Sequence, residues 1–187
     1  MSLVLIPQPL GKEAPSSTLP DTNMHFLIDD LRPSDWGQVR AIYLEGIATG
    51  NATFETQAPT WERWDGAHLP FARLVARAAE EVLGWGALSP VSDRCCYAGV
   101  AEASLYVDGR HRGQGIGTAL LEAIIERAEA NGIWTLQGGV FPENHASLAL
   151  LKKCGFREVG RRERLGKLHR VWRDVLLLER RSRVVGV

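Results

Sequence analysis

The stretch that decides the fold runs from Ser104 to Ala128 and reads SLYVDGRHRGQGIGTALLEAIIERA. It joins the end of an alternating strand pattern to a helical run through three glycines. The helical run carries an apolar stripe at i, i+4 spacing, formed by Ile116, Leu120, Ile124 and Ala128 and widened by Leu121 and Ile125. This spacing predicts an amphipathic helix that ends at Asn131-Gly132.

The three glycines, Gly113, Gly115 and Gly117, stand at alternate positions just before this helix. Without side chains, the loop leaves its backbone N–H groups open to an anion, and the helix start adds unpaired donors and a positive dipole end. Arg112 adds a formal charge. The loop is therefore predicted to hold a phosphate or pyrophosphate. The alternative is a turn that only lets the helix pack closely on a sheet, and the spacing matches neither the Rossmann nor the Walker pattern.

The strand before the loop, GVAEASLYVD at 99–108, has two unlike faces. One face carries alanines, leucine and valine, and the other carries Glu102, Ser104 and Tyr106. A carboxylate in the middle of such a strand is a candidate catalytic group, and the competing interpretation is a structural ion pair.

Strand and helix patterns alternate along the rest of the chain with short connections, which predicts an α/β fold. Helices are expected at 33–50, 59–69 and 142–156, and strands at 25–32 and 133–141, the latter with a bulge or close approach at Gly138-Gly139. Hairpins are expected at 72–91 and, with a basic loop, at 157–181.

Composition limits the function classes. The 187 residues fit one domain, and 22 Lys plus Arg balance 22 Asp plus Glu, so no global field favours nucleic acid or an anionic membrane. Residues 1–23 are expected to form a flexible extension of little functional weight before a domain at 24–187, with no apolar run of membrane length. Three cysteines, two of them adjacent, favour reduced thiols and a cytoplasmic location. No His, Cys or Asp cluster has metal-ligand spacing, so no metal is expected.

Several segments together resemble the GNAT N-acetyltransferases. YVDGRHRGQGIGTALL at 106–121 resembles their acyl-CoA pyrophosphate loop, and GGVFPENHASLALLKKCGF at 138–156 resembles a later strand and an Asn-containing helix start. ATFETQAPT at 52–60, GVAEASLYVD and GKLHRVWRDVLLLER at 166–180 are similar to the branch that acetylates phosphinothricin, arsinothricin and related small amino acids. The resemblance covers roughly residues 24–181. It implies a mixed central sheet of about seven strands flanked by helices, an acetyl-CoA cosubstrate and a homodimer.

The resemblance also implies direct acetyl transfer to a primary amine in a ternary complex. Glu102 matches the family's proposed base, and an α-amino group, which titrates near ~8, needs only a modest one. A backbone N–H of the Leu105-Tyr106-Val107 strand would polarise the thioester carbonyl, where the family splays two parallel strands apart. Carried over residue by residue, the positions that face CoA are Val107, Arg112, Gly113, Gly115, Gly117 and Thr118. Asn144 would lie near the pantetheine arm, or would simply cap its helix.

The acceptor site is expected to include Phe54 and Glu55, which match a segment lining the family's substrate pocket. Arg73 and Arg77 share a strand face and could grip a carboxylate or phosphinate, with surface solvation as the plainer interpretation, favoured for Arg77. One departure concerns Leu151, which stands where many relatives have a Tyr or His able to protonate the leaving thiolate.

Three functions follow as hypotheses. The first is an N-acetyltransferase for a small amino-acid-like amine, giving resistance to phosphinothricin or a similar toxic analogue. The second keeps the cosubstrate but acetylates a protein N-terminus or another amine. The third is a non-catalytic CoA-binding module, motivated by Leu151.

Overall fold

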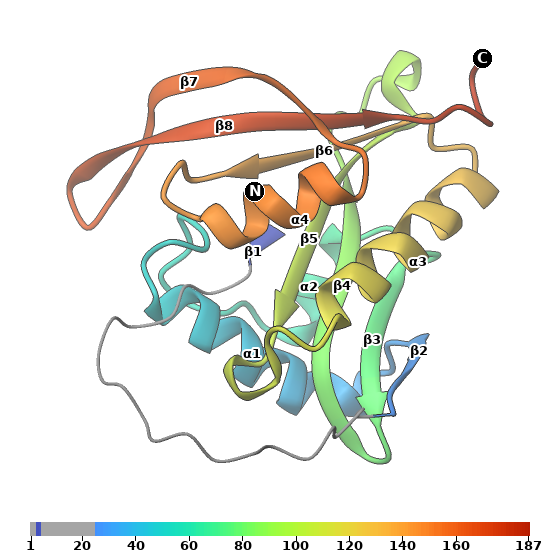
Figure 1. The fold of residues 1–187 in the computed structure, drawn as a ribbon, viewed down its shortest axis with the longest axis vertical. Coiled ribbons are helices and arrows are strands. Elements are labelled where there is room, and N and C mark those ends of the chain that lie inside the picture. The colour runs from blue at the N-terminus through green and yellow to red at the C-terminus, as the bar shows by residue number, and fades with distance from the viewer. Residues whose placement is uncertain (1–2, 5–24) are drawn as a thin grey trace, which may run out of the picture.

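The computed structural model describes residues 3–4 and 25–187. Eight strands and four α-helices alternate along this part of the chain (Figure 1). The strands are β1 (Leu3–Val4), β2 (Leu27–Asp30), β3 (Arg73–Ala78), β4 (Glu81–Pro90), β5 (Val100–Val107), β6 (Thr135–Val140), β7 (Arg157–Leu168) and β8 (Val171–Arg181). The helices are α1 (Trp36–Ala48), α2 (Trp61–Ala67), α3 (Ile116–Ala130) and α4 (His145–Lys153), with short 3-10 turns at Pro33–Asp35, Cys95–Tyr97 and Gly109–His111.

Seven strands form one mixed sheet in the order β2-β3-β4-β5-β6-β8-β7. Neighbours pair antiparallel except β5 and β6, which are parallel because α3 crosses over between them. The expected strand–helix alternation and the mixed sheet of about seven strands are confirmed. Each helix also lies within the range that its periodicity predicts.

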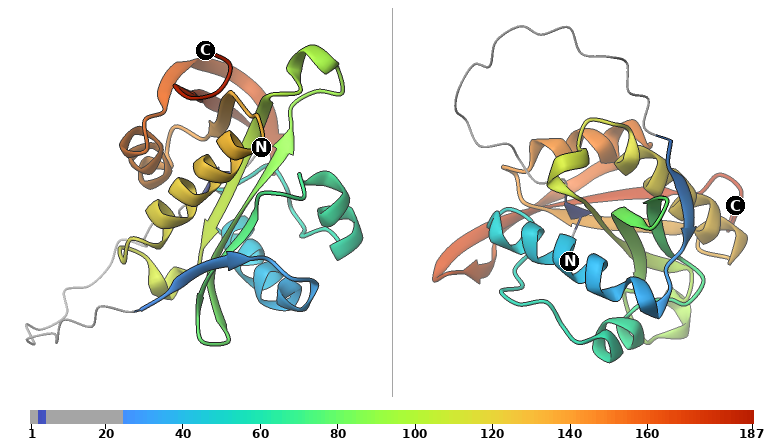
Figure 2. Two further views of the ribbon diagram at one scale, coloured as in Figure 1. Left: turned by 90° about the vertical axis from the view of Figure 1, so that its right-hand side faces the viewer. Right: turned by 90° about the horizontal axis from the view of Figure 1, so that it is seen from below.

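Helices cover both faces of the sheet (Figure 2). The larger core lies between the sheet and the pair α3 and α4, and a second core lies between the sheet and the pair α1 and α2. β5 contributes to both, as its alternation predicts: Ala101, Ala103, Leu105 and Val107 enter the α3 side, and Tyr106 enters the α1 side. Glu102 and Ser104 therefore share a face with Tyr106.

α3 packs directly on two glycines of β4. A Cβ built at Gly86 would lie 2.4 Å from Ile124 Cδ1, and one built at Gly84 would lie 3.2 Å from Leu120 Cδ1. These glycines let the helix approach the strand closely, so the start of α3 is held at a fixed height above the sheet.

β5 and β6 pair over only three register positions and then separate. The last pair is Glu102 with Gln137. Beyond it, β1 pairs parallel with β5, Leu3 opposite Leu105 and Val4 opposite Tyr106. The remainder of the extension expected at 1–23 lies outside the described residues.

Two details of β6, β7 and β8 differ from or extend the sequence expectation. The bulge expected at Gly138-Gly139 is wrong, because the ladder between β6 and β8 continues without a register shift through both glycines. β7 and β8 form a long hairpin that reaches beyond the helices (Figure 1). The basic side chains expected in its loop region are all exposed, namely Arg161, Arg162, Arg164, Lys167, His169 and Arg170. Within the described part of the chain, no helix is long and apolar enough to cross a membrane.

Candidate active site

The glycine loop between β5 and α3 has the backbone that only glycine adopts without strain. Gly113 has φ +74° and Gly115, the N-cap of α3, has φ +82°. A residue with a Cβ would cost roughly 1–2 kcal/mol in this left-handed region. No protein atom lies within 4 Å of a Cβ built at either position, so both glycines face open space. The loop therefore presents bare backbone to its surroundings.

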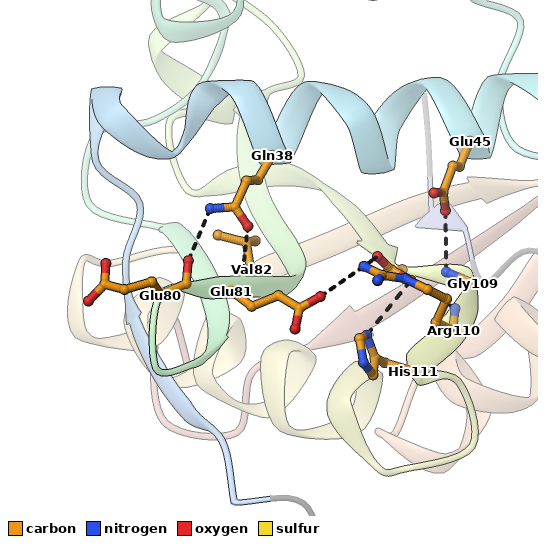
Figure 3. Close-up of polar contacts among 9 residues, drawn as sticks. Gln38, Glu45, Glu80, Glu81, Val82, Gly109, Arg110 and His111 are labelled. Atoms are coloured by element: carbon orange, nitrogen blue, oxygen red, sulfur yellow. Dashed lines mark hydrogen bonds and ion pairs between the residues drawn. The ribbon is translucent and has the colours of Figure 1, made fainter.

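The turn that leads into the loop is tied to α1 and to the β3–β4 turn (Figure 3). The Gly109 N–H donates to Glu45 Oε2 at 3.3 Å, and the Arg110 guanidinium donates to Glu81 Oε1 and Asp108 Oδ2, both at 2.8 Å. Burial acts to raise the pKa of Asp108, but its hydrogen bonds from Arg110 outweigh burial and leave the pKa lowered. These contacts fix where the glycine loop starts.

A cavity of about 340 Å³ lies between the glycine loop, the first turn of α3 and one side of α4. Its lining includes every residue expected to face CoA through its side chain or loop amide: Val107, Arg112, Gly113, Gly115, Gly117 and Thr118. Sequence reasoning missed His111 and Lys153, which also line it. Lys153 Nζ donates to Thr118 Oγ1 at 3.3 Å, so a cation from α4 reaches the start of α3.

The cavity carries an excess of basic groups. Burial lowers the pKa of Arg112, and the nearby charges of Glu45 and Asp108 oppose that shift. With Lys153 on the opposite wall, two cations and the donors at the α3 N-terminus converge on one volume. Such a set suits a pyrophosphate.

The main chain of Leu105 and Tyr106 lies where β5 and β6 separate. On one side these residues pair with β4, and on the other side β1 occupies the edge. Any group that uses the N–H and C=O groups of this edge must replace β1.

Glu102 stands at the start of this separation, half-buried on the α1 side of the sheet. Gln137 Nε2 donates to Glu102 Oε2 at 3.1 Å from the β6 side, and Ser89 lies opposite Glu102 on the β4 side. Both Ser89 and Ser104 line a second cavity. Glu102 itself is not among the residues that line that cavity, but these two strand neighbours are.

The second cavity measures about 440 Å³ and opens between α1, α2 and the sheet. Its deep wall is aromatic: Tyr106 stacks on Trp85 with ring centroids 4.7 Å apart and meets the edge of Tyr43 at 4.9 Å. The remaining lining is polar or small: Thr53, Glu55, Thr56, Gln57, Ala58, Pro59, Arg63, Ala67, His68, Ser89 and Ser104, with Trp64 completing the wall.

Two titratable groups in this wall are neutral near pH 7. Burial and the negative charge of Glu55 raise the pKa of Tyr43, although hydrogen bonds with Thr53 and Tyr106 oppose the shift. Burial lowers the pKa of His68, whose Nδ1–H donates to the Trp64 carbonyl at 2.6 Å while the ring stacks on Trp64. The formal charges of the lining are therefore those of Glu55 and Arg63.

The structure separates the predicted acceptor residues. Glu55 lines the second cavity, whereas Phe54 lies beside it in a small apolar gap and meets the edge of the Phe141 ring at 4.9 Å. Arg73 does not line the cavity. It pairs with Asp65 and donates to the carbonyls of Asp65 and His68, so it holds the end of α2 against β3.

Arg77 also has a structural role. Its guanidinium forms an ion pair with Asp35 at 2.9 Å and is only 11% exposed, so the solvated surface position favoured from the sequence is wrong. Burial acts to raise the pKa of Asp35, but the hydrogen bond and charge of Arg77 outweigh it and lower the pKa.

Asn144 caps α4, as expected: its Oδ1 accepts from the Ser147 N–H at 3.2 Å, and its Nδ2 donates to the Asn51 carbonyl at 3.2 Å. Leu151 is completely buried in the core between α4 and the sheet. Cys95, Cys96 and Cys154 are free thiols. Among residues 3–4 and 25–187, no three His, Cys, Asp or Glu side chains are grouped to hold a metal.

Comparison with known proteins connects this geometry to an activity. Residues 35–156 match the acetyltransferase (GNAT) family. The chain is 31% identical to an L-methionine sulfoximine/L-methionine sulfone acetyltransferase of Pseudomonas aeruginosa over 162 residues, which cover 83% of this chain and 94% of that protein.

Solved structures agree with the sequence match. A phosphinothricin acetyltransferase from Sinorhizobium meliloti, determined with acetyl-CoA, superposes with a TM-score of 0.75 at 27% identity, covering 83% of this chain and 88% of that one. A ribosomal-protein-alanine N-acetyltransferase from Brucella melitensis gives a TM-score of 0.76 at 28% identity, covering 83% and 99%.

Proposed function

The chain belongs to the GNAT acetyltransferase family, and we propose that the cavity beside the glycine loop binds acetyl-CoA while the second cavity binds the small amino acid that is acetylated. It is an acetyl-CoA-dependent N-acetyltransferase whose acceptor is a small amino-acid-like amine. The single observation that carries the assignment is the glycine loop ahead of α3, with positive φ at Gly113 and Gly115, facing a cavity lined by basic residues.

The cavity beside the glycine loop is proposed to hold the pyrophosphate of acetyl-CoA. Backbone N–H groups at the start of α3 donate to the phosphate oxygens, and Arg112 and Lys153 supply the charge. α3 is packed against β4 through Leu120 and Ile124, so the donors at its N-terminus are in place before the cosubstrate arrives. The thioester then extends along β5 toward Tyr106 and replaces β1 at that edge.

Glu102 is proposed as the base. The acceptor ammonium loses a proton to its carboxylate, directly or through a water, and the free amine attacks the thioester carbonyl carbon. The backbone N–H groups of Leu105, Tyr106 and Val107 are the candidates to stabilise the developing oxyanion. The C–N bond forms, the C–S bond breaks, and CoA leaves as a thiolate. Leu151 is buried and aliphatic, so it takes no part in protonating the thiolate.

The second cavity is proposed to bind the acceptor, with Arg63 rather than Arg73 binding its anionic group. Arg73 is already bonded to the side chain and the carbonyl of Asp65 in α2. Arg63 lines the cavity, and within residues 25–187 its guanidinium has neither an ion pair nor a side-chain hydrogen bond. Such a cation, on a helix held in place by Arg73, is suited to a carboxylate or phosphinate.

The relatives indicate which small amino acids are acetylated. We infer that phosphinothricin and methionine sulfone are substrates and that the α-amino group is the site of acetylation. N-acetylation removes the charged ammonium by which an amino-acid analogue resembles its parent, so resistance to a toxic analogue is the proposed consequence. A cytoplasmic location, supported by the free thiols, and a homodimer, supported by family resemblance, belong to the same proposal.

A second acceptor class is a protein N-terminus, which the similarity to the Brucella ribosomal-protein-alanine enzyme favours. Thiol release from acetyl-CoA, measured with phosphinothricin, methionine sulfone and a peptide panel, separates the possibilities. Turnover with the two amino acids and not with peptides supports the proposal. Turnover with peptides alone supports the second class, and acetyl-CoA binding without turnover of any amine identifies a non-catalytic module.

The role of Arg63 has its own test. Arg63→Gln is expected to raise KM for methionine sulfone by about 10–100-fold, the value of a charge-assisted hydrogen bond. KM for the decarboxylated amine 3-(methylsulfonyl)propylamine is expected to stay unchanged. Arg40→Gln on the exposed side of α1 serves as the matched control. Equal effects on both amines would show that Arg63 does not bind the carboxylate.

A further inference from the structure

A row of five polar side chains crosses the sheet at the level of Glu102. Strand register places Ser89 opposite Glu102, Glu102 opposite Gln137, Gln137 opposite Glu179, and Glu179 opposite Arg157. Residues opposite one another in register lie on the same face, so this polar row runs over β4, β5, β6, β8 and β7 on the face that Tyr106 shares with α1.

Gln137 is the member of the polar row that touches the proposed base. Its Nε2 donates to Glu102 Oε2 at 3.1 Å, and both side chains are partly buried. The two residues form the last register pair before β5 and β6 separate. The contact therefore lies at the point where the acetyl group and the acceptor must meet.

The rest of the polar row explains why an amide suits this position. Glu179, on the far side of Gln137, is paired with Arg157, so its charge is compensated. The amide of Gln137 brings no charge and does not titrate, so it can hold a carboxylate without becoming its proton partner. A glutamate side chain has three rotatable bonds, and a fixed donor on one oxygen restricts them.

We propose that Gln137 is a positioning residue that holds the Glu102 carboxylate toward Ser89 and the acceptor cavity. This inference rests on the proposed function, in which Glu102 takes the acceptor's proton. Gln137 itself touches neither substrate; it acts through Glu102. Acetyl-CoA binding, which depends on the glycine loop, is independent of it.

The test is a double-mutant cycle between Gln137 and Glu102, read in kcat with methionine sulfone or with whichever amine turns over. Gln137→Met keeps the length of the side chain and removes the donor. It is expected to lower kcat about 10-fold or more, the value of a hydrogen bond to a charged group, with KM for acetyl-CoA unchanged. In the Glu102→Gln background the same substitution is expected to change kcat less than twofold, because the base that it positions is gone.

Gln137→Glu gives a second readout, because the glutamate side chain has nearly the same size and shape as glutamine. It places a carboxylate against Glu102, and the acid limb of the kcat/KM profile is expected to move to higher pH, because adjacent carboxylates resist sharing negative charge. Thr135→Val, two residues earlier on the same strand face, is the matched control and should leave kcat and the profile unchanged. Melting temperatures confirm that each variant folds.

The outcomes separate two failures. If Glu102→Gln retains full activity, Glu102 is not the base and the proposed mechanism fails. If Glu102→Gln is impaired but Gln137→Met lowers kcat equally in both backgrounds, or leaves it unchanged in the wild type, Gln137 does not position Glu102. If Gln137→Met fails to fold, an unshifted acid limb in Gln137→Glu overturns the inference.

Discussion

The contact between α3 and β4 predicts that two destabilising substitutions rescue each other. A methyl group added in Gly86→Ala would lie 2.4 Å from Ile124 Cδ1, which is well inside van der Waals contact. Overpacking of this kind costs about 1–3 kcal/mol. Ile124→Val deletes the same Cδ1 atom and, alone, costs about 0.5–1.5 kcal/mol for the lost burial and the gap left behind. The double variant moves one methyl group from helix to strand.

The double variant is therefore expected to be more stable than the sum of the single changes by at least about 1 kcal/mol. The other atoms near the new methyl, the Ser104 carbonyl oxygen at 3.4 Å and Ile124 Cγ1 at 3.6 Å, leave room for it. Urea unfolding of the four proteins measures the cycle, and 1 kcal/mol corresponds to a melting shift of roughly 2–4 °C for a chain of this size.

A matched control uses Gly37 on α1, where a Cβ meets no atom within 4 Å. Gly37→Ala combined with Ile124→Val should be additive. Additive free energies for Gly86→Ala with Ile124→Val would refute the reasoning, since they would mean that the helix does not rest on this glycine.

Three further predictions address the site. Glu102→Gln should lower kcat by about 10²–10⁴-fold, as loss of a general base does, while calorimetry finds an unchanged acetyl-CoA affinity; a matching loss of affinity would argue for a structural carboxylate instead. Because burial holds the pKa of His68 below 6.5 in the folded state, stability should be level above about pH 6.5 and fall as pH drops through the folded pKa. Melting temperatures between pH 7.5 and 5.5 should fall less in His68→Gln, and parallel curves would exclude His68 as a source of the pH dependence. Deleting residues 1–24 removes β1, which pairs with β5 over two register positions. Acetyl-CoA should then bind up to about 30-fold more tightly, because it no longer has to break two backbone hydrogen bonds worth roughly 1 kcal/mol each. Weaker binding would show instead that the strand supports the site.

Local patterns predict most of this fold. The alternation of β5 fixed which side chains share a face with Glu102, and the i, i+4 stripe of α3 placed the glycine loop at a helix start. Both patterns arise because a half-buried strand or helix must keep its apolar residues on one side. The loop residues expected to face CoA line one cavity, because the loop joins the end of β5 directly to the start of α3.

Contacts between distant segments could not be read in this way. The guanidinium of Arg73 is suited to binding an anionic substrate, but α2 folds back beside β3 and brings Asp65 to it. Lys153 and Thr118 are 35 residues apart and meet only because α4 packs next to α3. The sequence predicts that Gln137 lies in a strand, but it does not show which residue of the neighbouring strand lies opposite. The contact of Gln137 with Glu102 is therefore seen only in the register of β5 and β6.

The central claim is that the glycine loop binds acetyl-CoA, and calorimetry of acetyl-CoA with Gly115→Val tests it most directly. Gly115 has φ +82° and lines the cavity, and a Cβ there meets no protein atom, so valine projects into the space assigned to the pyrophosphate. The account predicts binding by the wild type and by Gly37→Ala, and none by Gly115→Val. Equal affinity in all three proteins would contradict it.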